Sequence, residues 1–305
     1  MSLVTTKKLL LKAKENHYAV GAFNFTTLEQ LKAIVRACEN LKTGCILATS
    51  ETAIKFMGIK NIVDFVKNEI ENSFIEYSLH LDHGKSFDIC STCINAGYTS
   101  VMIDASSLSF EDNINLTKKV VDYAKKFNVS VEGELGKIQG VEDCISSAES
   151  IFTSPKEALE FIKRTGVDSL AISIGTSHGA YKFKGESKLD IERLKQIDLQ
   201  TNHFPLVLHG ASSVSEKLKE DFCSVGGELG TAKGVDDKSI IDAINGGICK
   251  INVDTDLRIA FTTGVRKCLL DEKIFGLREY LNLGIDYMQK EVENRIRLFN
   301  NNVNN

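Results

Sequence analysis

The segment Thr99–Leu135, TSVMIDASSLSFEDNINLTKKVVDYAKKFNVSVEGEL, carries the pattern that decides the fold. Two short apolar runs rich in β-branched residues, Thr99–Asp104 and Val129–Leu135, have the composition of strands. Between them, Phe110–Phe127 has the spacing of an amphipathic helix. A strand, a helix and a second strand in this order predict parallel strands joined by a helical crossover.

The same alternation repeats along all 305 residues, with eight strand-like runs in total. Amphipathic stretches such as Leu28–Leu41, Lys156–Arg164 and Ile191–Leu199 separate them. Eight parallel strands with outer helices predict a (β/α)8 TIM barrel, which belongs to the α/β class. A doubly wound open sheet is the alternative, but no Gly-x-Gly-x-x-Gly follows the first strand, which disfavours its dinucleotide-binding form. The other six predicted strands are Ala19–Asn24, Cys45–Thr49, Ile75–Leu81, Asp168–Ile174, Pro205–His209 and Cys249–Val253.

We expect a single domain, with the barrel over about residues 1–272, C-terminal helices over 273–300 and a disordered tip at 301–305. Two segments are longer than ordinary connectors. Gly136–Ser154 is polar with little periodicity and is expected to act as a long active-site loop, or lid. Ser213–Asp237 is an insertion after the seventh strand. The tail Phe275–Leu298 indicates one or two amphipathic helices that pack on the barrel or on a neighbour.

Composition is that of a soluble globular protein, with 43% hydrophobic and 26% charged residues. The 37 basic and 41 acidic side chains give a net charge of −4 without any Lys/Arg block, which disfavours nucleic acid or a membrane as partner. No apolar run reaches the roughly 18–20 residues of a membrane span. The eight scattered cysteines indicate reduced thiols, and Cys90-x-x-Cys93 lies within a predicted helix. These features predict a cytoplasmic protein.

Three of the six histidines, His83, His178 and His209, stand just past different predicted strands. In a barrel of this kind, chemistry belongs at the carboxyl ends of the strands. Three converging imidazoles would leave coordination positions open for water or substrate, as in a catalytic zinc site. Each histidine alone could be a structural residue, but their joint position beside acidic residues favours the metal. His80 shares the strand face of Asp82 and could be a buried partner.

Acidic and hydroxyl side chains follow the same strands. Asp82 precedes His83, so its carboxylate could reach a metal-bound group, whereas Asp104 and Glu134 could accept hydrogen bonds from the imidazoles. The segments His209–Ser213 and Asp254–Asp256 follow strands seven and eight, where barrels commonly bind phosphate. Alternatively, Ser212 and Thr255 are helix N-caps. Lys182 and Arg258 are separated cations that would suit a substrate with phosphate at both ends.

Taken together, these residues resemble the class II, metal-dependent fructose-1,6-bisphosphate aldolases along nearly the whole chain. The insertion with Gly226-Gly227 and Asp236-Asp237 is similar to the fructose-type branch, since tagatose-bisphosphate aldolases usually have a shorter connection there. The matching segments are Gly21–Asn24, His80–Gly84, Val131–Gly136, Gly175–Lys182, Leu208–Val214 and Lys250–Arg258.

The resemblance implies one catalytic Zn²⁺ per subunit, bound by His83, His178 and His209. It implies that Asp82 exchanges the proton of the C4 hydroxyl, that Glu142 on the long loop exchanges the proton at C3, and that Asn252 holds the enediolate. Arg258 would contact the distal phosphate, often from a neighbouring subunit, and the phosphate site often holds Na⁺ or K⁺. The implied substrate and phosphate contacts are Asn24, Ser50, Gly179, Lys182, Gly210, Ser212, Asp254, Thr255 and Arg258.

The implied reaction is the reversible cleavage of fructose 1,6-bisphosphate to dihydroxyacetone phosphate and glyceraldehyde 3-phosphate, a step of glycolysis and gluconeogenesis, by a homodimer or homotetramer. Tagatose 1,6-bisphosphate remains an alternative substrate. A Schiff-base aldolase would need Lys250, which more readily forms a buried ion pair. A non-catalytic sugar-phosphate-binding barrel would require a broken site. The chain departs from the family at Ala48, Ala105–Ser107 and Ser215, none of which is an implied ligand or proton-transfer residue.

Overall fold

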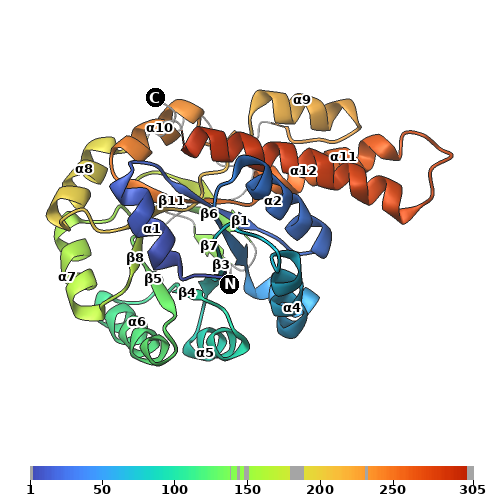
Figure 1. Cartoon of the computed structure of the whole chain (residues 1–305). Helices are drawn as coiled ribbons and strands as arrows, with labels where there is room; N and C mark the ends of the chain where they lie inside the picture. The colour runs from blue at the N-terminus through green and yellow to red at the C-terminus, as the bar shows by residue number, and fades with distance from the viewer. Residues whose placement is uncertain are drawn as a thin grey trace.

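The structure is a computed structural model that describes residues 3–137, 139–142, 145–147, 151–178, 189–230 and 233–300; for 139–142, 145–147 and 178 it describes the backbone alone. Within these ranges, eight parallel strands form a closed barrel (Figure 1). Neighbouring strands follow chain order, and the last strand closes against the first with Val20 opposite Lys250. The predicted (β/α)8 barrel is therefore confirmed. Its strands are β1 (Val20–Asn24), β2 (Cys45–Thr49), β3 (Tyr77–Gly84), β4 (Ser100–Ile103), β5 (Ser130–Leu135), β8 (Ser169–Ile172), β10 (Leu206–Leu208) and β11 (Ile248–Val253).

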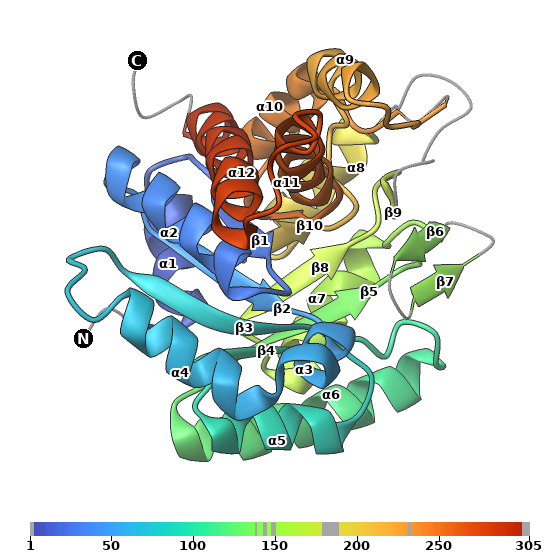
Figure 2. The same ribbon diagram turned by 90° about the vertical axis from the view of Figure 1, so that its right-hand side faces the viewer.

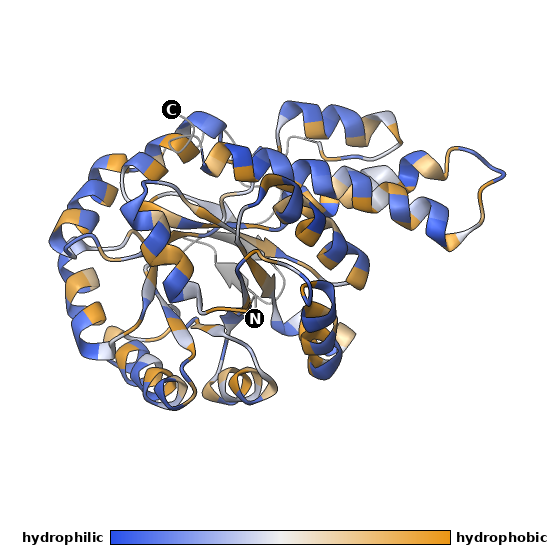
Figure 3. Ribbon diagram, in the orientation of Figure 1, coloured by the Kyte–Doolittle hydropathy of each residue, from blue (hydrophilic) through white to orange (hydrophobic). Residues whose placement is uncertain are grey.

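Amphipathic helices surround the barrel, and their hydrophilic residues alternate with hydrophobic ones along each ribbon (Figure 3). Several begin at a Ser, Thr or Asp whose side chain accepts a hydrogen bond from a backbone N–H of the first turn, as Thr27 and Ser109 do. The helices are α1 (Thr6–Glu15), α2 (Leu28–Leu41), α3 (Glu51–Met57), α4 (Ile59–Glu69), α5 (Phe87–Ala96), α6 (Phe110–Ala124), α7 (Pro155–Thr165), α8 (Ile191–Gln200), α9 (Glu216–Ser224), α10 (Asp237–Asn245), α11 (Thr255–Cys268) and α12 (Leu277–Phe299), with a short 3₁₀ turn at Lys125–Phe127.

Helix α1 lies across the amino-terminal mouth of the barrel, a feature that the sequence pattern did not reveal (Figure 1). Its buried Leu9, Leu10 and Ala13 belong to an apolar cluster that includes Val20 of β1. The Thr6 hydroxyl also lies 2.8 Å from the Ser78 hydroxyl of β3. This mouth is therefore covered, and a small pocket lies at the opposite mouth, at the carboxyl ends of the strands.

A small sheet stands beyond that carboxyl mouth (Figure 2). It contains the antiparallel hairpin of β6 (Gln139–Glu142) and β7 (Ile145–Ser147), with β9 (Ser177–His178) parallel to β6. The long polar segment expected to be irregular thus contains two short strands. Their side chains lie outside the described residues, so a lid remains a prediction. The insertion after the seventh strand contains α9.

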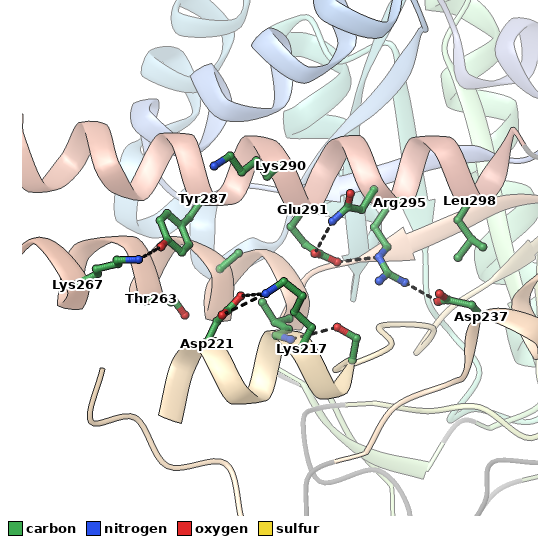
Figure 4. A pocket seen from close by; sticks show the side chains of 14 residues that line it. Lys217, Asp221, Asp237, Thr263, Lys267, Tyr287, Lys290, Glu291, Arg295 and Leu298 are labelled. Atoms are coloured by element: carbon green, nitrogen blue, oxygen red, sulfur yellow. Dashed lines mark hydrogen bonds and ion pairs between the residues drawn. The ribbon is translucent and has the colours of Figure 1, made fainter. Parts of the chain in front are cut away.

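The C-terminal tail forms a single helix, α12, which packs antiparallel to α11 and against α2, and the α11–α12 pair projects away from the barrel (Figure 1). Buried Arg295 on α12 donates to Glu291 at 2.8 Å and lies 3.2 Å from Asp237 (Figure 4). All cysteines in the described ranges are free thiols, and Cys90 and Cys93 are buried on α5. Over the same ranges, no helix has the length and apolar character needed to cross a membrane.

Gly133 on β5 allows α7 to approach the barrel closely. A Cβ at this position would lie 2.8 Å from Phe161 Cε1 and 3.2 Å from Val167 Cγ1. Gly133→Ala should therefore lower the free energy of unfolding by about 1–3 kcal/mol, as overpacked cores do. Urea unfolding would measure the loss. The same substitution in a Phe161→Leu background should cost less, because the blocking ring is gone; an equal cost in both backgrounds would contradict the contact.

Candidate active site

Asp82 and His83 are consecutive, yet both line one small pocket at the carboxyl mouth. In a regular strand their side chains would point to opposite faces. Here the pairing of β3 with β4 shifts register between Leu81 and Gly84, and His83 has the left-handed φ of 50°. Gly84 is required behind this bend, since a Cβ there would lie 2.8 Å from the Met102 carbonyl oxygen. Because of this bulge, the carboxylate of Asp82 and the imidazole of His83 line the same pocket.

The imidazoles of His83 and His209 meet edge to face, with ring centroids 4.5 Å apart. A carboxylate orients each ring. His83 Nδ1 donates to Asp104 Oδ2 at 3.0 Å, and His209 Nε2 donates to Glu132 Oε1 at 2.8 Å. Potential ligand atoms of Asp82, His83 and His209 all lie within 4.8 Å of one another. Carboxylate-anchored imidazoles are typical of metal ligands, so these residues fit a metal ion.

Burial and charge make this mouth favourable for a cation. Burial lowers the pKa of His83, but the Asp82 carboxylate and the hydrogen bond to Asp104 more than offset it and raise that pKa to about 9. Burial, reinforced by the charge of Asp104, raises the pKa of Glu134 to about 8. Glu134 Oε2 lies 3.7 Å from His83 Nδ1 and has no hydrogen-bond partner among the described residues. Lys85 offsets part of the negative charge, at 2.6 Å from Asp104.

Two amides hold the carboxylate of Asp82. Asn24 Nδ2 donates to Asp82 Oδ2 at 2.8 Å, and Asn252 Nδ2 donates to Asp82 Oδ1 at 3.0 Å. Burial raises the pKa of Asp82, but the neighbouring His83 and His209 outweigh it and lower that pKa below its ordinary value. Asp82 is therefore an oriented, ionised carboxylate at neutral pH. The buried Oδ1 atoms of Asn24 and Asn252 have no partner within the described residues and suit the hydroxyl groups of a substrate.

The third predicted ligand, His178, lies on β9, and its side chain is outside the described residues. Its backbone is opposite Gly140 in β6, the strand that also contains Glu142. Gly210, which follows His209, touches the same segment: a Cβ there would lie 2.7 Å from the Ser177 carbonyl oxygen. The backbone thus brings the segments of His178, His209 and Glu142 together. Gly179 and Lys182 fall outside the described residues.

The two predicted phosphate loops are hydrogen-bonded to each other. Ser212 Oγ accepts from the Asp254 backbone N–H at 3.4 Å. Thr255 is the first residue of α11, whose N-cap is Asp254, and α9 is capped by Ser215. The alternative that Ser212 and Thr255 are N-caps is therefore wrong.

Two other residues that were predicted to contact the substrate form hydrogen bonds or ion pairs within this chain. Ser50 caps α3 by accepting from the Ala53 N–H. Arg258, half-exposed, pairs with Asp254 through contacts of 3.0 and 2.7 Å. Among the departures from the family, Ser106 donates to Asp104 Oδ1 through both its backbone N–H and its hydroxyl.

The sequence did not reveal three supporting side chains. Glu132 anchors His209, Lys85 pairs with Asp104, and Asp256 accepts from the backbone N–H groups of Ser213 and Val214 at 2.9 and 2.8 Å. The spacing of Glu132 and Glu134 on one strand offered a signal, because both face the barrel interior. The partners of Lys85 and Asp256 depend on register and loop shape, which the sequence pattern did not specify.

The fold and the site together define a (β/α)8-barrel enzyme whose chemistry lies at the carboxyl ends of its strands. The sequence pattern of the family described as "Fructose-bisphosphate aldolase class-II" matches residues 4–304. Fructose-bisphosphate aldolase of Helicobacter pylori (strain ATCC 700392 / 26695) is 46% identical, over 97% of this chain and 97% of that protein. That of Thermus caldophilus is 43% identical, over 97% of this chain and 98% of that protein.

Among solved structures, the YdjI aldolase from Escherichia coli K12 superposes with a TM-score of 0.79 at 27% identity, covering 97% of each chain. The chain belongs to the class-II fructose-bisphosphate aldolase family, whose members are lyases. The resemblance inferred from the sequence is thereby confirmed.

Asp256 should shape the loop that follows β10, because its fully buried carboxylate holds two successive N–H groups. Asp256→Asn leaves one acceptor oxygen for two donors, so we expect a loss of about 1–3 kcal/mol in the free energy of unfolding. The KM for a phosphorylated substrate should rise more than kcat falls. Asp236→Asn, at the exposed N-cap of α10, is the control and should leave KM unchanged. Equal effects of the two variants would refute the role of Asp256.

Proposed function

We propose that this chain reversibly cleaves fructose 1,6-bisphosphate to dihydroxyacetone phosphate and glyceraldehyde 3-phosphate, with Zn²⁺ held by His83, His178 and His209. The observation that carries the zinc site is the pair of buried imidazoles, each oriented by its own carboxylate. Their surroundings favour a positive charge, as the raised pKa of His83 indicates. Asp104 and Glu134 support His83 from behind.

When bound, the metal would supply Lewis-acid polarisation of the substrate carbonyl, which stabilises the charge left by cleavage. The chain's own residues would handle the protons. Asp82, an oriented carboxylate beside His83, accepts the C4 hydroxyl proton as the C3–C4 bond breaks and its electron pair passes to C3. The same carboxylate returns that proton in the condensation direction.

Glu142 is proposed to deliver the proton that C3 then requires. The backbone of its strand pairs with β9, beside the segment of His178. Asn252 and Asn24 position the substrate hydroxyls through the amide oxygens that Asp82 does not use. Of the two proton carriers, Asp82 is anchored on a barrel strand, whereas Glu142 belongs to the separate hairpin.

The phosphate groups are assigned to the loops after β10 and β11. Gly210, Ser212 and Thr255, with Gly179 and Lys182, would bind the dihydroxyacetone-phosphate end. The positive φ of Gly210 and the start of α11 at Thr255 support this assignment, because backbone N–H groups at such points suit anions. A Na⁺ or K⁺ ion at this phosphate site is part of the proposal.

The opposite end of the substrate is assigned to three residues, one of which, Ser50, is the N-cap of α3. Asp254 would contact the sugar chain, Arg258 the distal phosphate, and Ser50 a substrate oxygen. The Asp254–Arg258 ion pair supports their joint role, since it holds both side chains at one edge of the mouth.

We also propose a homo-oligomer, dimer or tetramer, located in the cytoplasm. Four large apolar side chains are exposed around the α11–α12 turn, including Phe275 at 94%. Such a patch is typical of an association surface. The other three are Leu269, Leu270 and Leu277.

A Schiff-base mechanism is disfavoured by the state of Lys250. Its ammonium is fully buried and 2.7 Å from Glu132 Oε2. A nucleophilic lysine must be unprotonated and open to the substrate, which this ion pair opposes.

Metal dependence and sugar preference test the proposal together. Metal-replete protein should cleave fructose 1,6-bisphosphate faster than the tagatose isomer, which differs at C4. Removal of the metal with a chelator should abolish cleavage, and Zn²⁺ should restore it, because the charge left on the three-carbon fragment then lacks its stabiliser. Full activity in chelator, with borohydride trapping of substrate on Lys250, would instead establish the Schiff base.

Solvent exchange at C3 of dihydroxyacetone phosphate separates the two proton carriers, because it needs no aldehyde and no group serving the C4 hydroxyl. Asp82→Ala should lower cleavage by at least about 10²-fold but keep much of this exchange. Glu142→Ala should lose the exchange. NMR of the C3 proton in deuterated water would report both rates. Wild-type exchange in Glu142→Ala would remove Glu142 from its assigned role.

A further inference from the structure

A continuous chain of buried polar groups crosses the barrel interior beneath the pocket. It runs from Ser100 through His80, Lys250 and Glu132 to His209. The four contacts, in that order, measure 2.8, 3.4, 2.7 and 2.8 Å. Each of these side chains is at most 1% exposed. The groups come from five different strands or strand ends, so the chain exists only in the closed barrel.

The donors and acceptors in this chain have a fixed direction. A lysine ammonium can only donate, so His80 Nε2 must accept from Lys250 and His80 Nδ1–H must point to the Ser100 hydroxyl. Lys250 also donates to Glu132 Oε2. The other carboxylate oxygen, Glu132 Oε1, accepts from His209 Nε2–H. Each of the four contacts along the chain therefore has a defined donor and a defined acceptor.

We propose that Lys250 is a positioning residue for the metal ligand His209, acting through Glu132. The inference rests on the proposed function, in which His209 binds Zn²⁺. With Nε2–H committed to Glu132, Nδ1 is the atom with which His209 would hold the metal. His83 is held the other way round, by its Nδ1, and would use Nε2.

The role of Lys250 follows from the burial of Glu132. The Glu132 side chain is inaccessible to water, so its negative charge depends on a positive partner within the barrel. Lys250 is that partner, and neutral His80 holds the ammonium from the opposite side without competing for the charge. Without Lys250, the Oε2 atom of Glu132 would lose the donor that fixes the plane of the carboxylate, and the ring of His209, held by Oε1, would lose its fixed orientation.

Zinc affinity of the metal-free full chain tests this role, measured by competition with a chromophoric chelator. Lys250→Met should weaken Zn²⁺ binding about 10–100-fold, the usual effect of losing support for a metal ligand. The double variant Lys250→Met/Glu132→Gln should recover most of the affinity. The amide oxygen that this variant introduces at position 132 would still accept from His209, and no buried charge would need a partner.

Arg295→Met is the matched control, because Arg295 is also a buried cation paired with a glutamate, but lies between α12 and α10 (Figure 4). It should bind Zn²⁺ as the wild type does. Long-range ¹⁵N–¹H NMR of the zinc-loaded wild type should find the proton of His209 on Nε2, and Lys250→Met should weaken that preference. A merely structural lysine would lower stability without changing either measurement.

Three results would count against the proposals in different ways. Wild-type zinc affinity in Lys250→Met, or a double variant that binds no better than Lys250→Met, would overturn the positioning role alone. Failure of the wild-type chain to bind Zn²⁺ would overturn the proposed function. Should Lys250→Met not fold, Glu132→Gln alone carries the test. Lys250 and His209 donate to different oxygens of Glu132, so the amide would turn its NH2 group toward one of them, and an undiminished affinity would again overturn the role.

Discussion

The constraint on which the site depends is the compensation of buried charge. Inside the barrel a carboxylate without water must have an opposite charge or several donors, or else it takes a proton. Lys250 and His209 stabilise Glu132, Lys85 and His83 stabilise Asp104, and two asparagine amides hold Asp82. The buried Oε2 atom of Glu134 has no hydrogen-bond partner among the described residues, and burial raises the pKa of this carboxyl group to about 8.

The same charges make the mouth of the barrel a place for a cation. Four acidic side chains converge there against one fully buried lysine and one partly exposed lysine among the described residues. The imbalance is what raises the pKa of His83 to about 9, whereas burial and its charged neighbours lower that of His209 to about 4. The same negative surroundings would attract a divalent ion, which would displace the proton of His83 on binding. The acids are Asp82, Asp104, Glu132 and Glu134.

The sequence predicted the barrel and its strand ends because both depend on local patterns. Apolar runs and turn positions located all eight strands, and the alternation of side chains placed His80 correctly as a buried residue. The buried ion pair predicted for Lys250 is confirmed, but its partner could not be predicted, since Lys250 and Glu132 are 118 positions apart and meet only through barrel register. Helix α1 and the β6–β7 hairpin were not predicted for a related reason. Both are short elements that gain most of their stability from tertiary contacts, which a local sequence pattern does not show.

Two buried charged residues, Asp256 on α11 and Arg295 on α12, lie behind the loop of the proposed phosphate site. Asp256, fully buried, holds the N–H groups of Ser213 and Val214, the second of which has an unfavourable φ of 45° for a β-branched residue. Burial lowers the pKa of Arg295 on α12, but the negative charges of Asp256 and Glu291 outweigh it and raise that pKa. Because a strained loop persists only where its surroundings stabilise it, the Asp256 carboxylate is part of the support for the loop that follows β10. The charge of Arg295 therefore reaches Asp256 at the base of this loop, whereas, among the described residues, the hydrogen bonds of its guanidinium run to Glu291 and Asp237 and not to the residues of the proposed zinc site.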